Sequence, residues 1–160
     1  KNGTFLDVSG QVGAGIQTAK SSRGAAFADV DNDGDVDLLI ANMDDAPQLL
    51  RNNQAESNHW LMFKMNGKKS NRDGIGARIT VVTGTMEQMW QIKRTVGIYS
   101  ATDPRAHFSL GRTDKAHLIK AFWPSGKTQE FKNVAANQHY VIDEQEGLRK
   151  EEFAGKRRER

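Results

Sequence analysis

Residues 29–37 read Asp-Val-Asp-Asn-Asp-Gly-Asp-Val-Asp, which places five carboxylates at alternate positions and a glycine at the sixth. Carboxylates packed this closely repel one another. At a separation of about 5 Å and an effective dielectric constant of about 20, each pair costs roughly 3 kcal/mol. A hard cation with oxygen ligands offsets that cost, and Ca²⁺ suits this ligand chemistry. The sequence therefore predicts a Ca²⁺ loop.

The residues on either side of this aspartate loop (residues 29–37) indicate which kind of calcium loop it is. An EF-hand begins with the same D-x-D-x-D-G order but needs a bidentate glutamate at position twelve, where this chain has Ile40. Residues 26–30 and 36–41 alternate with period two, a pattern typical of strands. We therefore expect the loop at the tip of a β-hairpin and not between two helices.

The predicted metal ligands are the five acidic residues of the loop: Asp29, Asp31, Asp33, Asp35 and Asp37. Four of them are expected to bind through their side chains, and Asp35 through its main-chain carbonyl. Gly34 is expected at positive φ, because the backbone must fold around the ion. The alternative is an acidic, solvated turn without metal, since Asp, Asn and Gly are ordinary turn residues.

The segment around the loop resembles a known repeat family. Residues 24–29 (Gly-Ala-Ala-Phe-Ala-Asp), 40–42 (Ile-Ala-Asn) and 49–53 (Leu-Leu-Arg-Asn-Asn), together with the loop, are similar to FG-GAP/VCBS-type repeats over residues 3–53. The resemblance implies one β-propeller blade with Ca²⁺ in its loop. A propeller needs roughly four to eight blades. We therefore expect either other propeller blades, in a longer protein, or docking of this unit onto the rest of the chain or a protein partner.

Composition and charge limit the number of domains and the kinds of site that the chain can contain. The chain has 160 residues, enough for one sizeable domain or two small ones. Nine acids and four bases lie in residues 1–58, a net charge of −5, and the remainder carries +8. This split predicts two modules with different surfaces. Cysteine is absent, which excludes disulfides and thiolate metal sites.

The predicted Ca²⁺ also indicates where the protein is located. Low-affinity Ca²⁺ loops need millimolar calcium, which is found outside cells, so an extracellular or periplasmic location is expected. No apolar run approaches the length of a membrane span. The chain starts at Lys1 and not at Met, which predicts a processed protein or the C-terminal part of a larger one.

The second half of the chain reads as an all-β domain. Short runs with β-type patterning, separated by turn residues, predict an antiparallel β-sandwich or barrel, with strands over residues 59–65, 77–82, 86–96, 106–110, 118–123, 128–131 and 140–142. Residues 124–127 (Pro-Ser-Gly-Lys) predict a hairpin turn. Residues 55–58 read as a linker, and the charged residues 148–160 as a tail or short terminal helix.

This half also resembles a known domain. Residues 58–61, 70–77, 103–111 and 123–126 are similar to motifs of the ASPIC/UnbV domain, and the resemblance covers residues 58–143. That domain commonly follows FG-GAP/VCBS repeats, as in proteins similar to cartilage acidic protein. The predicted domains are residues 1–57, 58–147 and a tail, 148–160. Because no established catalytic activity belongs to the domain, we predict a non-enzymatic binding, adhesion or assembly module without catalytic residues.

One loop of this half is a candidate ligand site. Lys68, Lys69 and Arg72 give it a positive face, which predicts binding of a sulfated or phosphorylated glycan or an acidic partner. Together with Asn71 they are the predicted ligand-binding residues. The alternative is a turn whose Asn and Asp side chains bond their own backbone. The four histidines show no metal-ligand spacing, and no nucleophile–base motif is visible.

The remaining alternatives concern carbohydrate and nucleic acid. Trp60, Trp90 and Trp123 suggest a carbohydrate platform and hence an accessory domain of a secreted enzyme, but strand parity favours core packing for Trp90 and Trp123. The basic residues 156–160 are diluted by glutamates and lack interleaved aromatic residues, so no nucleic-acid partner is expected.

Overall fold

The computed structural model describes residues 3–53, 58–84, 86–98 and 100–151, and the chain divides into two compact units. The first unit holds Lys1–Gln54 and Thr95–Thr102, and the second holds Ala55–Arg94 and Asp103–Arg160. The first unit thus includes a short segment from the half of the sequence predicted to be a separate domain. Residues 55–57 of the predicted linker lie outside the described residues.

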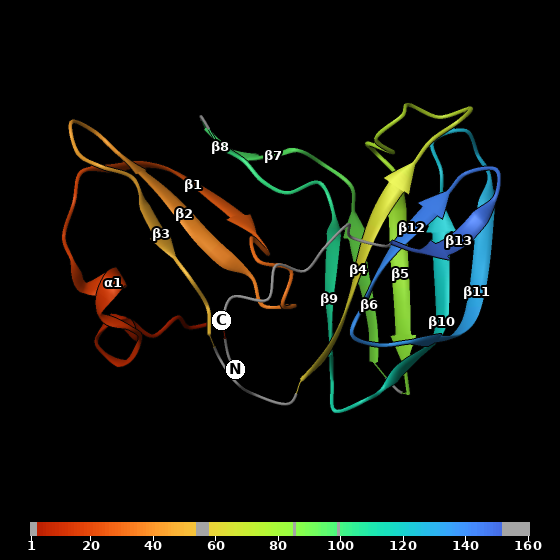
Figure 1. The fold of residues 1–160 in the computed structure, drawn as a ribbon, viewed down its shortest axis with the longest axis horizontal. Coiled ribbons are helices and arrows are strands. Elements are labelled where there is room, and N and C mark those ends of the chain that lie inside the picture. Colours follow the sequence, from red (N-terminus) through yellow and green to blue (C-terminus); the bar gives the residue numbers. More distant parts are fainter. Residues whose placement is uncertain (1–2, 54–57, 85, 99, 152–160) are drawn as a thin grey trace, which may run out of the picture. The chain divides into compact units, whose positions relative to one another are not determined.

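The first unit is built on one antiparallel sheet of three strands in the order β1-β2-β3 (Figure 1). A turn of 3-10 helix and a single turn of α-helix precede the sheet, and a separate hairpin of β7 and β8 accompanies it. The bounds are Ser9–Gln11 (3-10), Ala14–Gln17 (α1), Ser22–Ala28 (β1), Asp37–Asn42 (β2), Gln48–Leu50 (β3), Thr95–Gly97 (β7) and Ser100–Ala101 (β8).

Both faces of this three-stranded sheet carry large apolar side chains that remain about half exposed. Phe27 lies opposite Leu38, and Leu39 lies opposite Leu49. Because successive residues of a strand point to opposite faces, Phe27 and Leu39 lie on different faces of the sheet. Their exposed fractions are 48% and 46%, and that of Leu49 is 49%. Neither face of the sheet is therefore fully covered within the unit.

The second unit consists of two four-stranded sheets, in the orders β11-β10-β5-β6 and β13-β12-β4-β9. The sheets stack as two layers (Figure 1), which confirms the predicted all-β, sandwich-type fold, and neither sheet closes into a barrel. The strands are His59–Asn66 (β4), Arg78–Thr83 (β5), Met86–Gln91 (β6), Ala106–Gly111 (β9), Lys115–Phe122 (β10), Thr128–Ala135 (β11), Gln138–Asp143 (β12) and Gly147–Lys150 (β13).

Side-chain alternation along the strands builds the core between these two sheets. Leu61 and Phe63 of β4 are completely buried, as are Ile79 of β5 and Ile119 of β10. The Phe63 ring meets Phe108 edge to face, with 5.8 Å between ring centroids. The period-two pattern of the sequence thus predicted the core face correctly. One pair, β4 with β12, is parallel, and the other strand pairs are antiparallel.

The tryptophans and the predicted turn test the sequence interpretation in detail. Trp123 is 4% exposed and belongs to the core, as predicted. Core packing was wrong for Trp90, which is 38% exposed because β6 is an edge strand whose residues are mostly exposed. Residues 124–127 connect β10 to β11, and Gly126 has a positive φ of 88°. The hairpin turn is thus confirmed.

The C-terminal segment differs from its prediction. Residues 148–150 were expected to begin a charged tail or a terminal helix, but they form part of β13, which pairs with β12 through Ile142 opposite Leu148. Leu148 also packs against the core. The prediction was wrong there because the open edge of β12 and one apolar side chain outweigh the surrounding charge. Residues 152–160 lie outside the described residues.

In the part of the chain that the structure describes, no helix is both long enough and apolar enough to cross a membrane.

Candidate functional site

The aspartate loop connects β1 to β2, so it lies at the tip of a β-hairpin as predicted. Ala28 pairs with Asp37 at the base of the loop. Gly34 has a φ of 99°, which confirms the predicted positive φ, and Asn32 also has a positive φ of 59°. Two residues in this conformation turn the chain tightly enough to bring its acids together.

Two buried carboxylates organise the loop. Asp29 and Asp37 are each 2% exposed. Asp29 Oδ1 accepts a hydrogen bond from Asp33 N (3.1 Å), and its Oδ2 accepts one from Gly34 N (3.0 Å). Asp37 accepts from Val30 N and from Asn52 N, both at 2.9 Å. These bonds to backbone amides hold two acids inside the loop with fixed orientations.

Three acids of the loop lie close enough to share one cation. Asp29, Asp31 and Asp37 each offer a carboxylate oxygen, and these oxygens lie within 4.8 Å of one another. Oxygens bound to a single Ca²⁺ lie about 2.3–2.6 Å from the ion, so two of them are separated by about 5 Å at most. The spacing and the all-oxygen chemistry of the three carboxylates therefore fit a hard cation.

The other two predicted ligands lie outside this group of three. Asp33 Oδ1 accepts a hydrogen bond from Asp35 N at 2.9 Å, a local turn of the kind that Asp side chains commonly make. Direct binding of the ion by Asp33 or Asp35 stays a prediction. Arg51, which directly follows β3, donates from Nη2 to Asp31 Oδ2. This guanidinium offsets part of the negative charge of the loop.

The second unit contains a different acidic centre that the sequence analysis missed. Glu144 follows β12 and is 3% exposed. Its Oε2 accepts hydrogen bonds from three consecutive backbone amides, those of Lys68 (2.6 Å), Lys69 (2.7 Å) and Ser70 (2.8 Å). Its Oε1 accepts from the hydroxyls of Ser70 (2.8 Å) and Ser125 (2.6 Å). Successive amides converging on one oxygen form an anion-binding nest, here filled by the protein's own carboxylate.

The protonation state of Glu144 follows from these contacts. Burial raises the pKa of its carboxyl, but the hydrogen bonds from Ser125, Ser70 and Lys68 outweigh burial and lower the pKa to about 2. The pKa of neighbouring Asp143 is lowered as well, because bonds from the amides of Glu146 and Gln145 and from the Asn66 side chain outweigh the effect of its burial. Both buried acids are therefore ionised at neutral pH.

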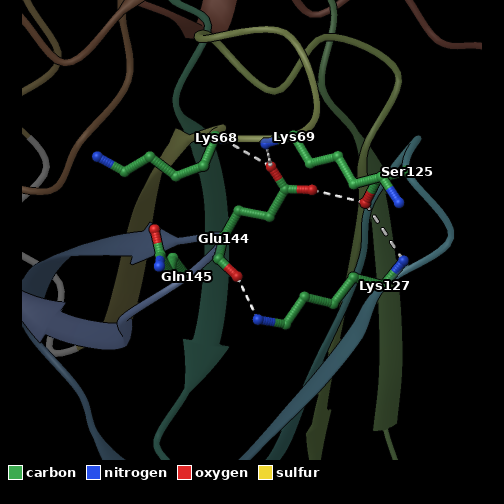
Figure 2. Close-up of a pocket in the computed structure, with 6 residues that line it drawn as sticks. All are labelled: Lys68, Lys69, Ser125, Lys127, Glu144 and Gln145. Carbon is green, nitrogen blue, oxygen red and sulfur yellow. Dashed lines mark hydrogen bonds between the residues drawn. The ribbon is translucent and has the colours of Figure 1, made fainter.

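Glu144 lies in a pocket of about 440 Å³, the Glu144 pocket, which is lined by Lys68, Lys69, Ser125, Lys127, Glu144 and Gln145 (Figure 2). Lys127 donates from Nζ to the main-chain carbonyl oxygen of Glu144. Lys68 and Lys69 extend in opposite directions from their loop (Figure 2). The Lys68 ammonium lies 3.6 Å from the Asp143 carboxylate. The pocket thus presents lysine side chains around a carboxylate that is already fully hydrogen-bonded.

The residues of the predicted anion site divide into two groups. Lys68 and Lys69 line the Glu144 pocket, but Asn71 and Arg72 do not. The Asn71 side chain donates to Ile75 O and accepts from Ile75 N, both at 2.8 Å, as the turn alternative predicted. Arg72 pairs with Asp73 at 3.3 Å. Lys127 and Glu144 lie too far along the sequence from Lys68 for any local pattern to have indicated them.

Acid should weaken the fold through Glu144. Its pKa is lower in the folded protein than the ordinary value of 4.5, so its contribution to stability is complete above about pH 4.5 and is lost as the pH falls towards 2. We expect the free energy of unfolding to fall steeply between about pH 4.5 and 2. In urea denaturation across this range, the difference between wild type and Glu144→Gln should shrink as the pH falls. A difference that does not change with pH would contradict the assignment.

The fold and the Glu144 pocket define an all-β sandwich domain whose loop is anchored on an internal carboxylate. The chain belongs to the family described as ASPIC and UnbV, which matches residues 67–149 and so includes every residue of the Glu144 pocket. It is also similar to cartilage acidic protein 1 of Mus musculus, with 29% identity over 119 residues. That match covers 72% of this chain but only 18% of the mouse protein. The FG-GAP/VCBS resemblance of residues 3–53 stays a prediction.

Proposed function

We propose that this chain is a non-enzymatic binding or assembly module of an extracellular or periplasmic protein, with Ca²⁺ as a structural ion in the aspartate loop. The observation that carries the proposal is the group formed by Asp29, Asp31 and Asp37, whose oxygens lie within 4.8 Å of one another. Two of these acids are buried, and like charges held this close repel one another more strongly away from water. An ion between them would stiffen the hairpin without taking part in chemistry.

Calcium is favoured over other hard cations by the irregular shape of the loop. Magnesium demands near-octahedral geometry and gives up its water reluctantly, whereas Ca²⁺ accepts six to eight oxygens in flexible arrangements. Carboxylates held by a turn with two positive-φ residues offer such an arrangement. Loops of modest affinity are filled only where calcium is millimolar, and this supports a location outside the cytoplasm.

The first unit supports the assembly part of the proposal. Phe27 and Leu39, on opposite faces of its sheet, are each about half exposed. A sheet with apolar residues on both faces gains stability when it is covered on both, as a propeller blade is by its neighbours. The FG-GAP/VCBS resemblance of residues 3–53 implies the same arrangement, in which a blade packs between neighbouring blades. We therefore propose other blades of a larger protein as the partners of this sheet, and the length of the mouse relative leaves room for them.

The metal proposal is tested by calcium titration. Wild-type protein is expected to release or absorb heat on addition of CaCl₂ and to melt at a higher temperature, since a ligand that binds only the folded state stabilises it. Asp31→Ala removes one carboxylate from the group of three, and we expect it to weaken binding by at least about tenfold, equivalent to about 1.4 kcal/mol.

The control for this titration is Asp7→Ala, because Asp7 is an exposed acid of the same unit that lies outside the loop and bonds Ser9. It should bind calcium as the wild type does. Absence of any calcium-dependent heat or melting shift in the wild type would refute the proposal. Equal losses in the two variants would point to general charge effects instead of a site.

Binding of a sulfated glycan or another acidic polymer is a second candidate function, in which the chain would be an accessory domain of a secreted enzyme. The observation that favours it is the presence of Lys68, Lys69 and Lys127 around one pocket. The Glu144 carboxylate already occupies the amides of that loop. An external anion would therefore interact with the lysine ammonium groups and not with the nest.

A further inference from the structure

We propose that residues 95–98 and 100–102 act as a strap through which the ASPIC/UnbV segment closes the free edge of strand β1. The family match covers these residues, yet they belong to the first unit, while Arg94 and Asp103 on either side of them belong to the second. The strap is the hairpin of β7 and β8, in which Thr95 pairs with Ala101. The proposal depends on neither the metal nor the pocket.

The strap contacts β1 through two side-chain hydroxyls. Thr102 Oγ1 accepts a hydrogen bond from Phe27 N at 3.2 Å and also donates to Phe27 O. Ser100 Oγ accepts from Ala25 N at 3.2 Å and donates to the carbonyl oxygen of Ile98 at 3.1 Å. Each hydroxyl thus serves as donor and acceptor at once. Two residues satisfy three backbone groups of β1.

These contacts lie on the side of β1 that faces away from β2. Ala25 and Phe27 pair with Ile40 and Leu38 of β2, and their own amides donate to the strap. An edge strand with unpaired amides invites the addition of another strand. With the hydroxyls of the strap in place, a further strand would have to displace them first. The strap therefore closes this edge of the sheet to β-strand addition.

The position of the strap also links it to the aspartate loop. Phe27, whose amide and carbonyl both bond Thr102, lies two residues before Asp29. The strand that leads into the loop is thus held on one side by β2 and on the other by residues of the family-matched segment. The sheet of the first unit is consequently incomplete without a contribution from the ASPIC/UnbV part of the chain.

Hydrogen exchange on the full chain tests this inference. In the wild type, the amides of Ala25 and Phe27 should be protected. In the double variant Ser100→Ala/Thr102→Val, both amides lose their acceptors, and their protection should fall by about tenfold or more. Thr95→Val is the matched control, because the Thr95 hydroxyl makes no hydrogen bond to β1 within the described residues. It should leave the two amides protected.

Further measurements distinguish loss of the strap contacts from general unfolding of the protein. The amides of β5 and β10 in the second unit should keep their protection in the double variant. Thr102→Ser retains the hydroxyl and should keep Phe27 protected. The proposal is overturned if Ala25 and Phe27 exchange rapidly in the wild type, or if the double variant leaves their protection unchanged. It is also overturned if Thr95→Val lowers their protection as much as the double variant does.

Discussion

Replacing Glu144 by glutamine is expected to lower the free energy of unfolding by about 3 kcal/mol, the scale seen when one partner of a buried charged network is removed. The carboxylate accepts five hydrogen bonds, three of them from the consecutive amides of residues 68–70. A carboxamide offers only one acceptor oxygen, and its NH₂ group would face donors, so at least one buried donor loses its partner. Urea denaturation at pH 7 measures the loss.

The matched control for this substitution is Glu130→Gln. Glu130 lies on β11, pairs with Lys120 at 3.4 Å and has a half-exposed side chain. An exposed ion pair of this kind is worth about 0–1 kcal/mol. A loss in Glu144→Gln no larger than that in Glu130→Gln would show that the nest contributes little to stability. The structural role assigned to Glu144 would then be wrong.

Substituting Gly67 by alanine is expected to destabilise the protein by about 3 kcal/mol, the upper part of the range for overpacked sites. A Cβ atom at Gly67 would lie 2.0 Å from the carbonyl oxygen of Asn71, far inside contact distance. The obstacle is backbone, and the Gly67 amide donates to Arg72 O at 2.9 Å, so neither side moves freely. The loop that presents its amides to Glu144 must therefore deform. Thermal melting and urea denaturation both measure this change.

Gly84→Ala separates steric overlap from the general cost of losing a glycine. A Cβ at Gly84 meets nothing within 4 Å, although its φ of 54° is in the left-handed region. Its expected cost is about 1–2 kcal/mol from backbone strain alone. If Gly67→Ala is no more destabilising than Gly84→Ala, the loop is more deformable than the geometry indicates.

Much of the aspartate loop could be predicted from the sequence because its determinants are local. Asp29, Gly34 and Asp37 lie within nine residues, and the strands beside them show their alternation directly. The structure confirms the hairpin and the positive φ of Gly34. It brings three of the five predicted acids together. Which oxygens complete a coordination shell depends on side-chain conformations that a residue pattern does not specify.

The predicted anion site at residues 68–72 could be predicted only in part from the sequence. Its basic residues suggested a site for an external anion, yet its backbone amides bind Glu144, about 75 positions further along the chain. The sequence showed half of this arrangement: a polar loop with basic residues between two expected strands. The other half is one acid among many, and only the sandwich brings the end of β12 beside the turn.

The sequence by itself determined the acidic loop, the all-β class and, apart from Trp90, the residues assigned to the core, because turns and strand alternation depend on neighbours a few positions apart. Three features became visible only in the tertiary structure. They are the Glu144 carboxylate as the group bound by the amides of residues 68–70, the pairing of β13 with β12, and the contact of the strap with β1. Each of these joins backbone groups of one segment to a strand or side chain of another. Backbone amides and carbonyls are common to almost every residue, so the sequence carries no sign of which distant group will satisfy them.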